Sequence, residues 1–191
     1  DPPSTNYKGG PLFRGKTSSS HKIAVGGESA GANLAAVVAQ LWHNFGLPAL
    51  LHQMLVNPML DYSDDSEKYP SRAEFASGYG LMEAASWNWF KSLYLRNEAD
   101  TLDPRASPIA EDHLANLAPA LIITSEFDLL RDEGVSYANR LNEAGTFAKH
   151  VNFEGMIHGF FAMAPLLNEA VEAQALACNT LVDAMSGGTR E

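Results

Sequence analysis

Residues 23–34 read IAVGGESAGANL, and the order of residue types in this stretch decides the fold. The first five residues form a short apolar run that ends in glycines, which is typical of a strand buried on both faces. From residue 32 to residue 45 apolar side chains recur every three or four positions, which predicts an α-helix. Residues 27–31 lie between the two and have the pattern G-x-S-x-G. The stretch therefore predicts a tight strand-to-helix turn with Ser29 at its apex.

This turn suits a catalytic nucleophile. Gly27 and Gly31 are expected to let the strand and the helix approach each other closely, so that Ser29 projects from the turn. The first N–H groups of a helix have no partner within it and carry a partial positive charge, which stabilises an oxyanion. The alternative interpretation is a glycine-rich turn that only packs a strand on a helix.

The rest of the chain alternates between strand and helix patterns. Further strands are predicted at residues 50–56, 121–124 and 148–153, and further helices at 81–95, 135–144 and from Pro165 to about 185. Residues 61–70 are interpreted as a polar turn. This order predicts an α/β fold with a mostly parallel sheet flanked by helices. Residues 1–20 are predicted to be an irregular arm, and residues 21–191 the catalytic domain.

A serine nucleophile needs a base, and the base needs an acid that orients it. Functional groups of an α/β fold gather beyond the carboxyl ends of the parallel strands. Asp128 follows the predicted strand 121–124, and His158 follows the strand ending at residue 153 after a glycine-containing turn. The sequence therefore predicts that Ser29, Asp128 and His158 act together as nucleophile, acid and base.

Asp61 is the main rival for the acid, since it also follows a predicted strand. Its neighbours Asp64, Asp65 and Glu67 are interpreted as a solvated acidic turn rather than a cation site. The other five histidines lie in the arm, in a connector, near a helix end or within strands, and are expected to be structural.

In four stretches the chain resembles the microbial esterases of the hormone-sensitive-lipase group of α/β-hydrolases. These are residues 23–34 (IAVGGESAGANL), 103–109 (DPRASPI), 117–134 (LAPALIITSEFDLLRDEG) and 153–163 (FEGMIHGFFAM). The resemblance implies Ser29 as nucleophile, Asp128 as acid and His158 as base, with the Ala30 backbone N–H as one oxyanion donor. Members of the group usually carry Asp at the position of Glu28 and Gly at that of Ala32.

The resemblance also implies an upstream H-G-G-G segment that completes the oxyanion hole. Twenty-eight residues precede Ser29, and Gly9-Gly10 has no His before it. We therefore expect a partial α/β-hydrolase fold in which the N-terminal strands are missing. The strand at residues 23–27 would then present a bare apolar edge, which predicts a homo-oligomer formed through that edge.

The net charge, the cysteine count and the hydropathy of the chain limit the kinds of molecule that it is expected to bind. Thirteen Lys and Arg residues against 23 Asp and Glu residues give a formal charge of −10 and a pI near 5.0, which disfavours nucleic acids and anionic membranes. The single cysteine, Cys178, excludes an internal disulfide framework and a cysteine-based zinc site. No apolar run is long enough for a membrane span and no signal peptide is recognised, so a cytoplasmic location is expected.

Together these patterns predict a serine carboxylesterase that hydrolyses short-chain acyl esters through an acyl-enzyme, with neither a metal nor an organic cofactor. The alternative is a non-catalytic or weakly active partial hydrolase domain that lacks the H-G-G-G segment. The aromatic residues at 87–94 are predicted to pack against the core and in part to line a substrate pocket. Arg105 and Arg131 are predicted to form structural ion pairs.

Overall fold

The computed structural model describes residues 22–63, 67–77 and 81–187. The predicted arm at residues 1–20 lies outside these ranges, as do His21, Asp64 and Asp65. The elements are β1 (Ala24–Glu28), α1 (Ala30–Asn44), β2 (His52–Val56), α2 (Pro70–Glu74), α3 (Ala84–Tyr94), η1 (Glu98–Leu102), η2 (Pro108–Ala110), β3 (Ala120–Phe127), α4 (Arg131–Glu143), β4 (Ala148–Ile157), η3 (Phe160–Met163) and α5 (Asn168–Ser186).

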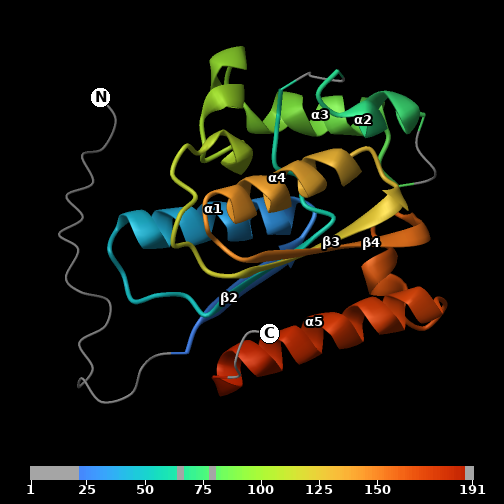
Figure 1. Cartoon of the computed structure of the whole chain (residues 1–191). Helices are drawn as coiled ribbons and strands as arrows, with labels where there is room; N and C mark the ends of the chain where they lie inside the picture. The colour runs from blue at the N-terminus through green and yellow to red at the C-terminus, as the bar shows by residue number, and fades with distance from the viewer. Residues whose placement is uncertain (1–21, 64–66, 78–80, 188–191) are drawn as a thin grey trace, which may run out of the picture.

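Four parallel strands form one sheet in the order β1-β2-β3-β4. Parallel neighbours need crossover connections, and α1 and α4 make two of them, between β1 and β2 and between β3 and β4 (Figure 1). This arrangement confirms the predicted fold class. Within the described ranges β1 pairs with β2 alone, so its other edge carries no strand.

Helices cover both faces of the sheet. Helices α1 and α4 lie on one face and α5 lies on the other (Figure 1). Successive side chains of a strand point to opposite faces, so Ile122 packs toward α1 and α4, whereas Leu121 and Ile123 pack toward α5. The apolar run at residues 121–123 is therefore fully buried on both sides.

Some predicted bounds were wrong. The last helix begins at Asn168 rather than at Pro165, because the short helix η3 and an extended Leu167 come before it. Strands β3 and β4 run on to Phe127 and Ile157, past a register shift between Ser125 and Phe127, so they are longer than predicted. Their extensions contain polar residues, which hid the strand pattern.

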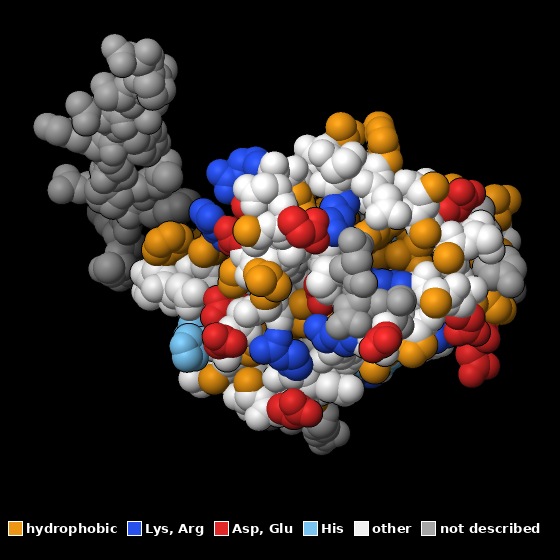
Figure 2. Space-filling view, turned by 90° about the horizontal axis from the view of Figure 1, so that it is seen from above, with side chains coloured by type: hydrophobic (Ala, Val, Ile, Leu, Met, Phe, Trp, Pro, Cys, Tyr) orange, Lys and Arg blue, Asp and Glu red, His pale blue; other side chains and the backbone are white. Residues whose placement is uncertain are grey.

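The predicted polar turn at residues 61–70 is largely wrong. Asp61, Tyr62 and Tyr69 are buried, and α2 begins at Pro70. Tyr62 packs in one cluster with Phe75, at the end of α2, and Trp87 of α3. Helices α2 and α3 form a further layer beside α1 and α4 (Figure 1). On this side Figure 2 shows hydrophobic side chains exposed among acidic and basic ones. Across the described ranges, no helix has the length and apolar character that a membrane crossing requires.

Candidate active site

Ser29 occupies the turn between β1 and α1 in a backbone conformation with φ 56° and ψ −118°. Non-glycine residues rarely adopt a positive φ, and such strained backbone is concentrated at functional sites. The Ser29 N–H donates to the carbonyl of Val56 at 2.8 Å, which anchors the turn to the end of β2. Ala30 is the first residue of α1, so its N–H has no acceptor within the helix.

The two glycines of the turn have different roles. A Cβ on Gly27 would lie 2.4 Å from the Gly31 carbonyl group, so only glycine lets β1 and α1 approach this closely. A Cβ on Gly31 would meet none of the described atoms within 4 Å. The expectation that both glycines are needed for the close approach is therefore correct for Gly27. It is wrong for Gly31, where a Cβ would fit.

The structure brings the three predicted site residues together. His158 Nδ1 lies 2.7 Å from Asp128 Oδ2, and His158 Nε2 lies 3.0 Å from Ser29 Oγ. When Nδ1–H donates to the carboxylate, Nε2 is left as an acceptor for the serine hydroxyl. Asp128 and His158 are both buried. This hydrogen-bonded series can accept the serine proton as its oxygen becomes a nucleophile.

Asp128 is fixed by neighbours that the sequence analysis missed. Its Oδ2 accepts a bond from Asn57 Nδ2 at 2.9 Å, and its Oδ1 accepts one from the Leu130 N–H at 3.0 Å. Asn57 is buried with φ 41°, a conformation that Asn tolerates better than most residues. It directly follows β2, so the strand-end rule that selected Asp128 would also have selected Asn57.

The surroundings favour a charged imidazole. Burial by itself lowers the pKa of His158, but the hydrogen bond and charge of Asp128, with smaller contributions from Glu28 and Glu133, raise it above its usual value. Burial also raises the pKa of the Glu28 carboxyl, against the opposing charge of His158. Glu28 directly precedes Ser29, and its Oε1 is buried with no hydrogen-bond partner among the described residues.

Asp61 does not contact His158; it serves the surrounding loop instead. Its carboxylate accepts hydrogen bonds from the Ser63 N–H, the Tyr69 hydroxyl and Lys68 Nζ at 2.8, 2.8 and 3.1 Å. Burial opposes ionisation of Asp61, but these bonds outweigh it and lower the pKa of the carboxyl below its usual value. Asp61 is thus a buried structural carboxylate.

Among the described residues, none of the other histidines (His43, His52, His113 and His150) forms a hydrogen bond with Ser29. His52 and His150 lie on strands, where burial lowers the pKa of both rings, and His150 Nε2 lies 2.8 Å from Thr124 Oγ1. Among the residues with described positions, no group of three or more His, Cys, Asp or Glu side chains is arranged to hold a metal ion.

An apolar cavity of about 370 Å³ opens beside Ser29. Its walls come from α1, from the segment after β2, and from α3 with the residues before it. The lining residues include Leu34, Met59, Tyr62, Met82, Phe90 and Tyr94. The volume and the mostly apolar lining suit a small organic molecule held next to the serine hydroxyl.

The aromatic residues of α3 divide as predicted. Trp87 is buried in the core, whereas Phe90 and Tyr94 line the cavity and Trp89 is 58% exposed. Both predicted arginine ion pairs are present in the structure. Arg105 pairs with Asp103 at 2.6 Å, and Arg131 pairs with Asp132 at 2.9 Å and Glu74 at 3.6 Å.

Comparison with known proteins identifies the family of this chain. A family model described as the alpha/beta hydrolase fold matches residues 14–162. The chain is 37% identical over 161 residues to an ethyl acetate hydrolase of Pseudomonas putida, a match that covers 84% of this chain and 49% of that protein. It is 40% identical over 150 residues to the carboxylic ester hydrolase LipN of Mycobacterium tuberculosis, covering 76% of this chain and 39% of LipN.

Solved structures give the same result. A hyperthermophilic esterase from the archaeon Pyrobaculum calidifontis superposes with a TM-score of 0.79 at 39% identity, over 87% of this chain and 53% of that one. The chain therefore belongs to the α/β-hydrolase fold family, and its predicted similarity to hormone-sensitive-lipase-like esterases is confirmed. The chain spans about half the length of these relatives or less.

Proposed function

We infer that this chain is a serine carboxylesterase that acts on short-chain acyl esters. The observation that carries the proposal is the hydrogen-bonded series Ser29–His158–Asp128, whose Ser29 lines an apolar cavity of about 370 Å³. The family relatives add support, since the two curated proteins described above are named as ester hydrolases.

The reaction has two steps. Ser29 Oγ attacks the ester carbonyl while His158 Nε2 takes its proton, and the collapse of the tetrahedral intermediate releases the alcohol, which receives that proton. Asp128 keeps the imidazole oriented and stabilises its charged form. Water then attacks the acyl-enzyme with His158 as base, which releases the carboxylic acid and restores Ser29.

The oxyanion is held at the start of α1. The backbone N–H of Ala30 is placed directly after Ser29, and the N-terminal end of a 15-residue helix adds a partial positive charge. The size of the cavity supports a small ester whose apolar acyl or alcohol group fits against Met59, Tyr62 and Tyr94.

A fluorophosphonate probe tests the nucleophile, and p-nitrophenyl acetate tests the activity. We expect the purified chain to be labelled and to hydrolyse the ester, and we expect Ser29→Ala to abolish both. Labelling without hydrolysis would instead support the weakly active partial domain. Labelling that persists in Ser29→Ala would assign the reactive group elsewhere.

A further inference from the structure

Residues 59–63, here called the pocket segment, form part of the cavity wall. Met59 and Tyr62 line the cavity beside Ser29, and the segment has no helical or strand structure. Residues 59–62 are nevertheless buried. A buried irregular segment must find acceptors and donors for its backbone groups on other elements.

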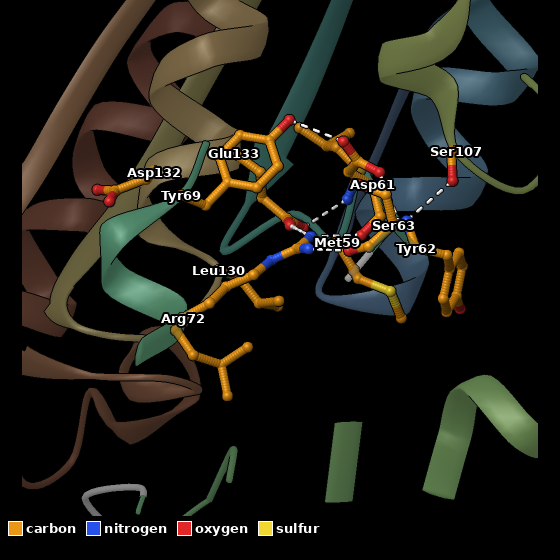
Figure 3. Close-up of polar contacts among 12 residues, drawn as sticks. Met59, Asp61, Tyr62, Ser63, Tyr69, Arg72, Ser107, Leu130, Asp132 and Glu133 are labelled. Atoms are coloured by element: carbon orange, nitrogen blue, oxygen red, sulfur yellow. Dashed lines mark hydrogen bonds and ion pairs between the residues drawn. The ribbon is translucent and has the colours of Figure 1, made fainter. Parts of the chain in front are cut away.

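Two charged side chains supply several of these partners (Figure 3). The Leu60 N–H donates to Glu133 Oε1 at 2.7 Å. The Arg72 guanidinium donates to the carbonyl groups of Asp61 and Ser63, and it pairs directly with Glu133 Oε2. The Arg72 and Glu133 side chains are only 8% and 0% exposed, so these contacts are made away from water.

The same pair lies close to the loop that carries Asp128. Glu133 is in α4, which begins three residues after Asp128, and Arg72 is in α2. Next to Arg72, Ser71 Oγ donates to the Leu129 carbonyl at 3.0 Å, and the Ser71 N–H donates to Asp132 at 2.8 Å. The two helices thus tie the pocket segment to the loop that carries Asp128.

A buried ion pair is a poor device for stability alone. Removing two charges from water costs several kcal/mol per ion, and apolar residues of similar volume often replace such a pair without loss of stability. What apolar side chains cannot supply is a fixed acceptor for the Leu60 N–H and fixed donors for the Asp61 and Ser63 carbonyls. The role of the pair therefore lies in placing the backbone.

The geometry points to Arg72 and Glu133 as positioning residues that determine substrate selectivity: they fix the pocket segment so that Met59 and Tyr62 keep the cavity shaped for an apolar group. A shift of the pocket segment should change the cavity more through Tyr62 than through Met59. The Tyr62 ring stacks on the Tyr94 ring of α3, with 5.5 Å between the ring centroids. The inference rests on the proposed ester hydrolysis for its substrate, but the placement of the segment can be measured without catalysis.

The test compares Arg72→Met/Glu133→Leu with Glu133→Gln and with Arg96→Gln/Asp100→Asn, which removes an exposed ion pair on another part of the surface. We measure kcat and KM for p-nitrophenyl acetate and p-nitrophenyl hexanoate, binding of hexananilide, and hydrogen exchange at the Leu60 and Tyr62 amides. In the apolar double variant we expect the hexanoate-to-acetate ratio of kcat/KM to fall about tenfold through KM. Hexananilide binding should weaken in parallel, and both amides should exchange faster.

Glu133→Gln keeps an oxygen acceptor for Leu60, so it should show a smaller loss of selectivity, and the surface control should show none. An unchanged selectivity ratio in a folded apolar variant would overturn the inference, whether or not the amides exchange faster. Should that variant fail to melt cooperatively, wild-type selectivity in Glu133→Gln overturns it instead. If the wild type binds hexananilide but hydrolyses neither p-nitrophenyl ester, the proposed function is contradicted. The affinity of the variants for hexananilide would then decide the role of the pair.

Discussion

At the scale of single residues, the strained φ of Ser29 is held by contacts on both sides of it. The residue donates its N–H to Val56, and its carbonyl accepts the N–H groups of Ala32 and Asn33 at 3.1 Å as the first turn of α1 forms. Asn33 in turn donates its side chain amide to the carbonyls of Met59 and Ala106. The turn, the helix start and the cavity wall are thus joined around Ser29.

The identity of the acid can be tested by two matched substitutions. Asp128→Asn should lower turnover by about 10⁴, because the amide no longer holds the imidazole in the tautomer that accepts the serine proton. Asp61→Asn removes a carboxylate that contacts only its own loop in the described structure, so its effect on kcat should be far smaller. Steady-state kinetics on a p-nitrophenyl ester give both values, and the reverse ranking would move the acid to Asp61.

Glu28 should shift the pH at which activity appears. In the proposed reaction the neutral imidazole is the base. Asp128 and, to a smaller extent, the Glu28 charge raise the pKa of His158 above its usual value, so activity should rise as the pH increases through that raised pKa. Glu28→Gln removes that charge, and the acidic limb of kcat/KM should move to lower pH. Glu172→Gln, on the exposed side of α5, is the control. A limb that stays in place in Glu28→Gln would show that Glu28 does not act on His158.

At the scale of secondary structure elements, the contact of β1 with α1 depends on one glycine. Gly27→Ala places a Cβ 2.4 Å from the Gly31 carbonyl group, so strand and helix must separate, and we expect a loss of about 1–3 kcal/mol in the free energy of unfolding. Gly31→Ala meets open space within α1, so it should be neutral or stabilising by up to about 1 kcal/mol. Urea unfolding of both variants measures the difference, and equal losses would contradict it.

The packing of α4 against the pocket segment should make stability depend on pH. Burial raises the pKa of Glu133 to about 7, although Arg72 and the Leu60 N–H oppose the shift. Between pH 4.5 and 7 the folded state holds a proton that the unfolded state releases, so this contribution to stability is present at low pH and is lost as the pH rises through about 7.

In Glu133→Gln the side chain has no carboxyl group, so it neither binds nor releases a proton in this pH range. The stability of the wild type relative to Glu133→Gln should therefore fall by about 3 kcal/mol between pH 4.5 and pH 8. Urea titrations of both proteins at the two pH values give the comparison. A constant difference would mean that Glu133 has the same pKa in the folded and unfolded states.

At the scale of the whole molecule, the described sheet has an open edge at β1. The Ile23 carbonyl and the Ser29 N–H form hydrogen bonds on the β2 side of β1. Backbone groups alternate in direction along a strand, so those of Ala24, Gly26 and Glu28 point away from β2, toward the open edge. Such an edge is a template for another strand. We propose that the chain self-associates through it, and sedimentation at tens of micromolar should give a mass above 20.6 kDa.

Ala24→Pro removes an outward N–H and leaves the bonds to β2 in place, so it should shift the chain toward the monomer. A wild-type mass of 20.6 kDa with a cooperative melt would show that the edge is covered within one chain.

The sequence by itself determined the parts of this protein that depend on local order. The apolar period and the glycines of residues 23–34 predict strand, turn and helix, because neighbours along the chain decide those conformations. The position of His158 and Asp128 after predicted strands was also readable, since parallel strands end at one edge of the sheet.

Only the tertiary structure decided which polar groups are buried together. Residues 61–70 have the composition of a surface turn, yet Asp61 and Tyr69 are buried. Tyr69 shares a core cluster with α4, lies under the Arg72 guanidinium of α2, and donates its hydroxyl to Asp61. Arg72 and Glu133 form a buried pair although 61 positions separate them in the sequence. No periodicity connects positions so distant, because their proximity arises from the packing of α2 against α4, and so this support of the cavity wall became visible only in the fold.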